Sequence, residues 1–251
     1  MAELVLLSII QGITEFLPIS SSSHLILFSQ FFNFSNSDLT LDVSLHLGSL
    51  LAIILYYKNY FKNILKNNNF FLKILFTSIP ISLVGFFLIK LNIIDSFRSY
   101  KVIGWSTIIF GLILFISDLN TNKNISKNFQ YKNIFFIGIM QVLSLVPGVS
   151  RSGIVITAAR LLKFNRIESA KIAFFTSIPV LILASTYNLF KIISDKNIDV
   201  SIYNMIGVLM SFFFSFVTIK FFISFLKKFN LLIFVIYRVV LGLLILFYVY
   251  V

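Results

Sequence analysis

Apolar stretches follow one another along almost the whole chain, separated mostly by charged or asparagine-rich breaks. Of the 251 residues, 58% are hydrophobic and 12% are charged, whereas soluble domains carry about 25% charged residues. A soluble globular fold is therefore close to excluded, and the 17% of aromatic residues excludes disorder. The length suits one multi-pass membrane domain. The stretches cover residues 4–34, 41–57, 70–90, 102–117, 133–159, 170–190, 203–223 and 231–251.

The net charge of +12 fits a membrane protein better than a nucleic-acid binder. The lysines cluster between the apolar stretches, where such residues orient membrane spans and meet anionic lipid. We therefore expect membrane lipids, and no nucleic acid, among the partners. The chain has no cysteine, which removes disulfides, thiolate nucleophiles and cysteine metal sites.

Two of the eight stretches are too polar for a straight helix in lipid. An arginine at a helix centre costs about 2.5–3.5 kcal/mol on insertion scales, and proline removes a backbone donor. Irregular backbone at membrane depth is tolerated only inside protein or beside a watery cavity. We interpret residues 4–34 and 133–160 as two re-entrant helix–loop–helix hairpins, which leaves six transmembrane helices. Their polar residues include Gln11, Glu15, Pro18, Ser20–Ser23 and His24 in the first hairpin, and Gln141, Ser144, Pro147, Gly148 and Ser150–Gly153 in the second.

The loop charges agree with this arrangement. With six spans and two hairpins, every strongly positive loop falls on one side, which the positive-inside rule makes cytoplasmic. Both termini then face outward, and the two hairpins enter from opposite sides. The positive loops contain Lys58, Lys62 and Lys66; Lys123, Lys127 and Lys132; Lys163, Arg166 and Lys171; and Lys227 and Lys228. The weaker loops contain Asp95, Arg98 and Lys101, and Asp195, Lys196 and Asp199.

A five-residue repeat indicates two related halves. The sequence Phe-Thr-Ser-Ile-Pro at 76–80 recurs at 175–179, and each copy follows one hairpin. Hairpins that enter from opposite sides make this an inverted repeat, a design common in transporters. The prediction is thus an all-α integral membrane protein, a single domain over 1–251, with repeats at about 1–117 and 133–251.

The first hairpin gathers groups for acid/base and nucleophilic chemistry. Gln11 and Glu15 share a helix face because they are four residues apart. Ser20–Ser23 follow a proline and favour the start of a second half-helix, whose free N–H groups make an anion site. His24 lies in the first turn of that half-helix.

The second hairpin offers an anion clamp. A tight turn at Pro147 and Gly148 leads into Ser150, Arg151 and Ser152, and the planar guanidinium suits phosphate. If the two tips meet, the site fits phosphoryl transfer, which needs a held phosphate, an aligned nucleophile and neutralised charge. Arg151 could instead pair with Glu15 merely to neutralise it. We expect structural roles for His46 and for the serines at 23, 29, 78 and 177, the serines through bonds to backbone carbonyls.

These residues resemble the motifs of a known family. The first is Gln-Gly-Ile-Thr-Glu-Phe-Leu-Pro-Ile-Ser-Ser-Ser-Ser-His at 11–24, and the second is Pro-Gly-Val-Ser-Arg-Ser-Gly at 147–153. The whole chain is similar to the undecaprenyl-diphosphatases, also called bacitracin resistance proteins. The resemblance implies six spans, two opposed re-entrant hairpins and an active site open to the periplasm. It also implies that undecaprenyl diphosphate loses its terminal phosphate, which regenerates the lipid carrier for cell-wall precursors.

Carried over by motif position, Glu15, Ser21, His24 and Arg151 would be catalytic. The family's dependence on a divalent cation implies Mg²⁺ or Ca²⁺, with Glu15 as a candidate ligand. Ser21, His24 or an activated water could be the nucleophile. The expected phosphate-binding residues are Ser20, Ser22, Gly148, Ser150, Ser152 and Gly153.

The chain departs from the family pattern at two positions. Gln11 stands where many members have Glu, which leaves Glu15 as the only carboxylate of that pair. Val155 replaces the Thr expected after the second motif, and Thr157 would face another side of the helix. Asp42 is a further acid that could support the site from the next span.

We therefore expect a bacterial inner-membrane phosphatase that hydrolyses undecaprenyl diphosphate and confers bacitracin resistance. The alternative is a transporter or flippase for an anionic lipid, which would need mainly the anion clamp and not Glu15 and His24 as proton-transfer groups. A purely structural scaffold would leave both polar hairpins unexplained. The sequence leaves the oligomeric state open, a homo-oligomer included.

Overall fold

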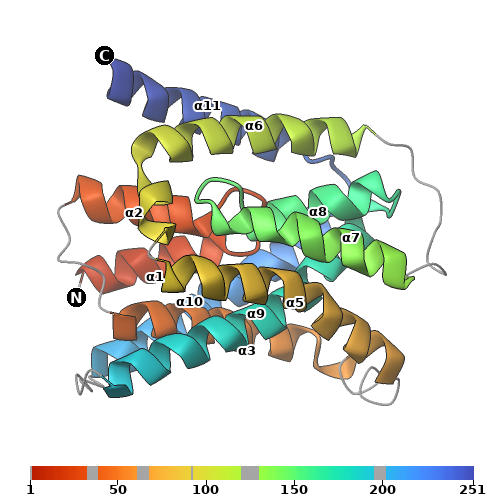
Figure 1. Ribbon diagram of the computed structural model, residues 1–251, viewed down its shortest axis with the longest axis horizontal. Coiled ribbons are helices and arrows are strands. Elements are labelled where there is room, and N and C mark those ends of the chain that lie inside the picture. Colours follow the sequence, from red (N-terminus) through yellow and green to blue (C-terminus); the bar gives the residue numbers. More distant parts are fainter. Residues whose placement is uncertain (1, 33–38, 61–67, 92, 120–129, 195–201) are drawn as a thin grey trace.

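The regular structure is helical throughout the described part of the chain (Figure 1). The computed structural model describes residues 2–32, 39–60, 68–91, 93–119, 130–194 and 202–251. The α-helices are α1 (Ala2–Thr14), α2 (Ser21–Phe31), α3 (Leu39–Tyr56), α5 (Asn68–Lys90), α6 (Tyr100–Asp118), α7 (Tyr131–Val142), α8 (Arg151–Leu161), α9 (Arg166–Ser194), α10 (Ile202–Leu226) and α11 (Leu232–Tyr250). Two 3₁₀ helices are η1 (Ile94–Arg98) and η2 (Leu143–Leu145).

Both polar stretches break in the middle, as predicted. The pair α1 and α2 extends from its connecting loop toward one end of the molecule, and the pair α7 and α8 extends toward the opposite end (Figure 1). The two connecting loops, residues 15–20 and 146–150, are called the first and second tip below. Opposed helix–loop–helix units are therefore present in the fold.

The two breaks share a backbone conformation that the sequence did not predict. Ser20 and Ser150 each stand immediately before the second helix of their pair, with φ of 75° and 69°. Positive φ is uncommon for a residue with a Cβ and costs about 1–2 kcal/mol. Gly148, with φ of 97°, completes the second turn. Each tip thus contains a strained serine that the surrounding contacts must hold.

Five helices are long and apolar enough to cross a bilayer, by length and composition, among the residues that the structure describes. These spans are Phe71–Lys90, Tyr100–Asp118, Arg166–Phe190, Asn204–Leu226 and Leu232–Tyr250. They match five of the six predicted spans. The sixth, α3, counts only as a shorter apolar helix over Thr40–Tyr56. The fold is therefore that of a multi-pass membrane protein with at least these five candidate spans.

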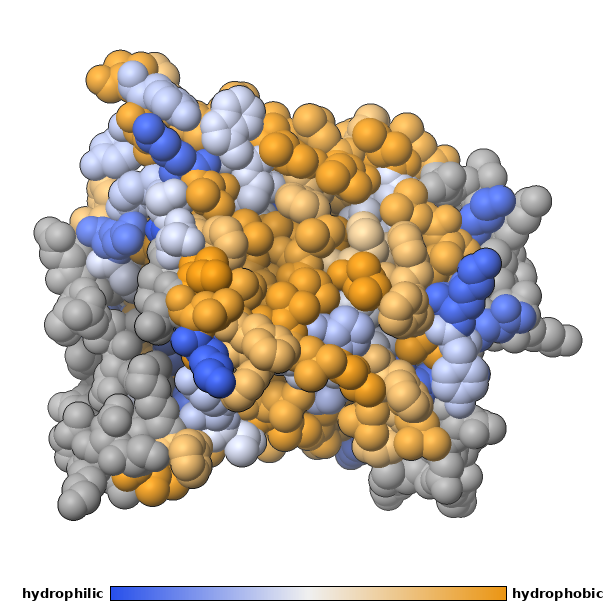
Figure 2. Space-filling model, in the orientation of Figure 1, coloured by the Kyte–Doolittle hydropathy of each residue, from blue (hydrophilic) through white to orange (hydrophobic). Residues whose placement is uncertain are grey.

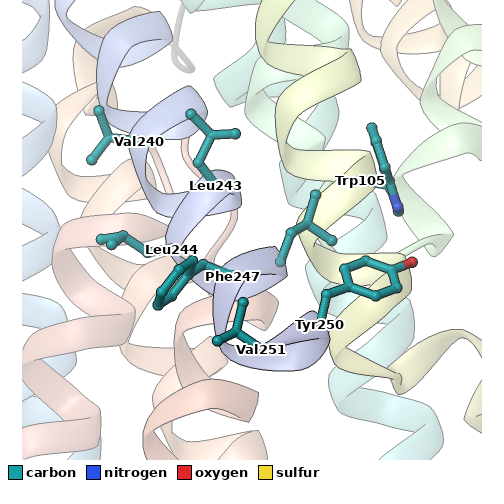
Figure 3. Close-up of a pocket in the computed structure, with 8 residues that line it drawn as sticks. Trp105, Val240, Leu243, Leu244, Phe247, Tyr250 and Val251 are labelled. Carbon is teal, nitrogen blue, oxygen red and sulfur yellow. The ribbon is translucent and has the colours of Figure 1, made fainter.

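The outer surface is apolar where a bilayer would contact it. A broad hydrophobic band crosses the middle of the molecule, and hydrophilic residues gather toward its two ends (Figure 2). Large side chains such as Phe86, Leu209 and Phe213 are more than half exposed. An apolar groove along α11 and α6 belongs to this surface, lined by Trp105, Val240, Leu243, Leu244, Leu246, Phe247, Tyr250 and Val251 (Figure 3).

Small residues let α3 and α10 approach closely. A Cβ added to Gly48 would meet the carbonyl oxygen of Val208 and lie 2.8 Å from the backbone nitrogen of Phe212. Beside it, the Ser49 hydroxyl contacts those of Ser211 and Ser215 at 3.2 and 3.0 Å. Close backbone approach with hydroxyl bonds is a common way to join helices in lipid.

The five-residue repeat does not occupy equivalent places in the two halves. Its copies lie in α5 and α9, but α3 separates the first hairpin from α5, whereas α9 directly follows the second hairpin. The two helices pack together and line a shared apolar groove that includes Ser78 and Pro179. The repeat motif therefore does not support the inverted repeat, and the matching breaks at Ser20 and Ser150 are the better evidence of two related halves.

Part of the predicted charge pattern falls on described residues. Lys58, Lys132 and Lys163 lie beyond the C-terminus of α3, at the start of α7 and beyond the C-terminus of α8. These helix ends lie at the same end of the molecule (Figure 1). Near α8, the Asp118 carboxylate binds Arg160 and Arg166 at 3.1 and 2.8 Å. The residues Lys62, Lys66, Lys123, Lys127, Asp195, Lys196 and Asp199 lie outside the described ranges.

We predict that Gly48→Ala lowers the melting temperature in detergent, because the added methyl group would press α3 away from α10. Overpacking of this kind costs about 1–3 kcal/mol. Gly85→Ala is the matched control, since its Cβ would lie 3.5 Å from the nearest heavy atom, in Leu145. Equal melting temperatures for the two variants would contradict the close packing of α3 and α10.

Candidate functional site

The first and second tips are joined by direct hydrogen bonds. The Gly148 backbone N–H donates to the Ser20 hydroxyl at 3.2 Å. The Ser152 hydroxyl donates to the Leu17 carbonyl at 2.7 Å. From the sequence, phosphoryl-transfer chemistry was expected only if the two tips lie in contact, and in the structure they do.

Arg238 ties the two tips together from α11. Its side chain is fully buried and donates to Pro18 O at 3.3 Å in the first tip. It also donates to the carbonyls of Gly148 and Val149 at 2.8 and 3.1 Å in the second tip. A fourth bond, from Nε to Thr107 O at 3.2 Å, anchors the guanidinium to α6. One cation therefore satisfies four buried carbonyls from three parts of the chain.

Glycines and a small hydroxyl make room for this arrangement. A Cβ added to Gly153 would lie 3.0 Å from Arg238 Nη1, and one added to Gly111 would lie 3.2 Å from Arg238 Cβ. A Cβ at Gly148 would collide with the Ser106 hydroxyl, which bonds to Pro147 O at 2.5 Å. Gly148 and Gly153 thus have packing roles beside any role in phosphate binding.

Glu15 is the centre of the polar cluster. Its buried carboxylate forms an ion pair with Arg151 across the two tips. The Ser21 hydroxyl donates to Glu15 Oε2 at 2.7 Å, and Gln11 Nε2 donates to the same oxygen at 3.0 Å. The Arg151 side chain is 16% exposed and that of Glu15 is 4% exposed. The guanidinium is therefore the more accessible member of the pair.

His46, for which we expected a structural role, extends this cluster. Gln11 Nε2 lies 3.1 Å from His46 Nδ1, so the amide joins the imidazole to Glu15. Gln11 Oε1 is buried and has no hydrogen-bond partner. Asp42, half-buried in α3, lies one helical turn before His46. The described residues contain no group of three or more His, Asp and Glu side chains that could hold a metal ion by themselves.

His24 is held at both ring nitrogens. Nδ1 lies 2.7 Å from the Ser20 carbonyl, and Nε2 lies 2.6 Å from the Tyr237 hydroxyl. The ring itself is buried. Sequence reasoning predicted His24 and missed Tyr237.

Most of the serine hydroxyls predicted to bind phosphate form hydrogen bonds with other groups of the protein. The Ser20 hydroxyl meets Ser22 and Ser23 at 3.3 and 3.1 Å. Ser150 accepts a bond from Gly153 N–H at 3.1 Å and lies 3.2 Å from Ser152. Of these serines Ser22 is the exposed one, and Ser21, which was predicted to be catalytic, is partly exposed.

The two helix starts differ in capping. Ser150 caps α8 through its side chain, whereas the side chain of Ser20 makes no capping bond to α2. First-turn N–H groups have no partner within a helix, and the start of a helix attracts anions. The start of α2, beside Glu15 and Arg151, is therefore the better anion site of the two.

Arg238 was missed although the sequence carried a signal for it. It is an arginine near the middle of the last apolar stretch, and an ionisable residue in such a place is a functional candidate by default. Among the serines expected to be structural, Ser78 and Ser177 bond backbone carbonyls as predicted, at 3.4 and 2.7 Å. Ser23 instead contacts the Ser20 hydroxyl.

Comparison with known proteins identifies relatives over the full chain. The family model described as bacitracin resistance protein BacA matches residues 4–244. A Pelagibacter ubique protein named undecaprenyl-diphosphatase is 42% identical over 250 residues, which cover 99% of this chain and 97% of the relative. Proteins of the same name from Saccharophagus degradans and Campylobacter concisus are 38% and 36% identical, with 95% and 96% of this chain covered and 94% and 96% of the relatives.

We predict that Arg238→Met lowers the melting temperature more than any surface cation variant. The methionine fills similar space but leaves buried carbonyls in both tips without a donor, at about 1–3 kcal/mol for each unsatisfied group. Thermal unfolding in detergent would measure the loss, with the exposed Lys227→Met as control. An Arg238→Met protein as stable as this control would refute the role of Arg238 in joining the tips.

Proposed function

Because this chain belongs to the bacitracin resistance protein BacA family, we propose that it hydrolyses undecaprenyl diphosphate to undecaprenyl phosphate and inorganic phosphate. The observation that carries the proposal is the contact of the two tips at Glu15, where a nucleophilic hydroxyl and a guanidinium share one carboxylate. This reaction regenerates the lipid carrier that cell-wall synthesis needs, and it gives resistance to bacitracin.

The diphosphate binds between Arg151 and the start of α2. Its oxygens compete with Glu15 for the guanidinium, which offers parallel N–H donors to phosphate. The first N–H groups of α2 face the same anion, since Ser20 does not cap them. Arg151 is the more accessible member of its ion pair, which supports its role as the group that meets the incoming substrate.

Ser21 is the nucleophile in this proposal. Its hydroxyl already donates to Glu15 at 2.7 Å, the arrangement of a nucleophile beside its base. The Ser21 oxygen attacks the terminal phosphorus, its proton passes to Glu15, and undecaprenyl phosphate leaves. Water then attacks the phosphorus of the phosphoserine, and inorganic phosphate leaves with both hydrogens of the water. Glu15 returns its proton to the serine oxygen, which restores the hydroxyl and the carboxylate. His24 is less suited to attack, because the Tyr237 hydroxyl is bound to Nε2 and the Ser20 carbonyl to Nδ1.

A divalent cation fits this donor set as a partner of the substrate. Mg²⁺ is usually held by one or two carboxylates together with substrate phosphates. Glu15 supplies one carboxylate, and the unpartnered Gln11 Oε1 is a second oxygen donor nearby. When bound, the cation would neutralise charge on the diphosphate. Asp42 is a further acid on the same side of α3 as His46.

We propose that the protein lies in the bacterial inner membrane, with the site open to the periplasm. In this arrangement α3 is the sixth span and both hairpins are re-entrant. Lys58, Lys132 and Lys163 at one end of the molecule support a cytoplasmic assignment of that end by the positive-inside rule. The isoprenoid tail stays in lipid against the apolar surface while the diphosphate reaches the tips.

We predict that purified protein releases phosphate from undecaprenyl diphosphate and that Arg151→Ala and Glu15→Gln each reduce the rate at least about 100-fold. Glu15→Gln should still bind the lipid, because it keeps the anion clamp. Phosphate release would be measured in detergent, with the exposed Lys228→Ala as the control. A folded parent that binds the lipid without releasing phosphate would instead support a carrier of anionic lipid.

We also predict that EDTA abolishes phosphate release and that Mg²⁺ or Ca²⁺ restores it. If Gln11 Oε1 helps to hold the cation, Gln11→Ala should raise the cation concentration that gives half-maximal rate. Gln141→Ala is the matched control, because Gln141 is equally buried but lies in α7. Full activity in EDTA would exclude the cation from this mechanism.

A further inference from the structure

The imidazole of His24 has one arrangement of protons that satisfies both of its contacts. The Ser20 carbonyl can only accept, so Nδ1 must carry a proton to make the 2.7 Å bond. In the neutral ring Nε2 then has the lone pair and accepts a hydrogen bond from the Tyr237 hydroxyl at 2.6 Å. Tyr237 therefore contacts the ring nitrogen that carries the lone pair of the neutral imidazole.

A phenol can form a hydrogen bond with Nε2 in both protonation states of the imidazole. It donates to Nε2 of the neutral ring, and its oxygen can accept from Nε2–H once the ring is protonated. A carbonyl or an ammonium group could serve only one of these states. The contact thus holds the ring in place without fixing its charge.

The position of Tyr237 is set by its neighbour in sequence. Arg238 binds carbonyls of both tips, which fixes this turn of α11 against the site. Tyr237 is 42% exposed as a residue, while its hydroxyl reaches the buried His24. The two rings lie nearly parallel, with centroids 5.7 Å apart. One turn of α11 therefore secures the tips and the imidazole together.

We propose that Tyr237 is a positioning residue for His24, whose ring it holds in the orientation used in the reaction. This inference rests on the proposed phosphatase function. It assigns α11, the last helix of the chain, a direct part in the site that the two motifs do not contain.

Tyr237→Phe tests the proposal because it removes only the hydroxyl. We expect kcat to fall about tenfold, as for loss of one hydrogen bond, while KM for undecaprenyl diphosphate stays unchanged. Tyr248→Phe is the matched control, since Tyr248 is 74% exposed on the same helix and its ring contact with Tyr100 survives the change. Equal kcat for Tyr237→Phe and the parent would overturn the proposal.

A spectroscopic measurement separates this role from general loss of structure. The chain has two histidines, so protein labelled with ¹⁵N only in histidine gives two sets of ring signals, which His46→Asn assigns. Tyr237→Phe should shift the Nε2 signal of His24, and Tyr248→Phe should leave it in place. An unshifted signal would also overturn the proposal. A parent without hydrolysis would refute the proposed function, and the spectrum would still decide whether Tyr237 binds His24.

Discussion

The site depends on one buried guanidinium. Arg238 comes from the last helix, yet its four bonds reach the first tip, the second tip and α6. A charge in a membrane interior is costly unless polar groups replace water around it. Here the irregular backbone of both tips supplies those groups, since its carbonyls have left regular helical bonding. The guanidinium and the tip carbonyls therefore offset each other's cost of burial. The broken helices and the buried arginine are stable only together.

This mutual dependence explains why glycines and small side chains occupy several positions that take no part in the proposed reaction. Gly111 and Gly153 leave the volume that the Arg238 side chain occupies. Gly148 passes close to Ser106 while it donates its N–H to Ser20 and its carbonyl accepts from Arg238. A motif glycine that looks like a phosphate ligand in sequence is thus explained first by packing. The candidate phosphate-binding groups that stay accessible are fewer, and they gather at Arg151 and the start of α2.

The sequence predicted what depends on local chemistry. Prolines and serines in an apolar stretch predicted both helix breaks, and the spacing of Gln11 and Glu15 predicted their shared face. It could not predict contacts made across the whole chain, such as the Tyr237 hydroxyl on His24, 213 residues away. It also gave too much weight to the recurring Phe-Thr-Ser-Ile-Pro, because two helices rich in the same few residues can share a short segment without sharing a place in the fold. The importance of Arg238 could have been predicted, because it is a lone charge in an apolar stretch, but its hydrogen-bond partners could not.

The run of four serines shows how one short segment serves structure and chemistry at once. Residues three apart lie on the same side of a helical turn, and Ser20 and Ser23 accordingly bond to each other on the buried side. Ser21 and Ser22 are less buried: the Ser21 hydroxyl donates to Glu15, and Ser22 is exposed although its hydroxyl also contacts that of Ser20. The strained φ of Ser20 is compensated on the same buried side, through Gly148 N–H and the ring of His24. Hence the inner pair fixes the geometry of the tip, and the outer pair is the more accessible to substrate.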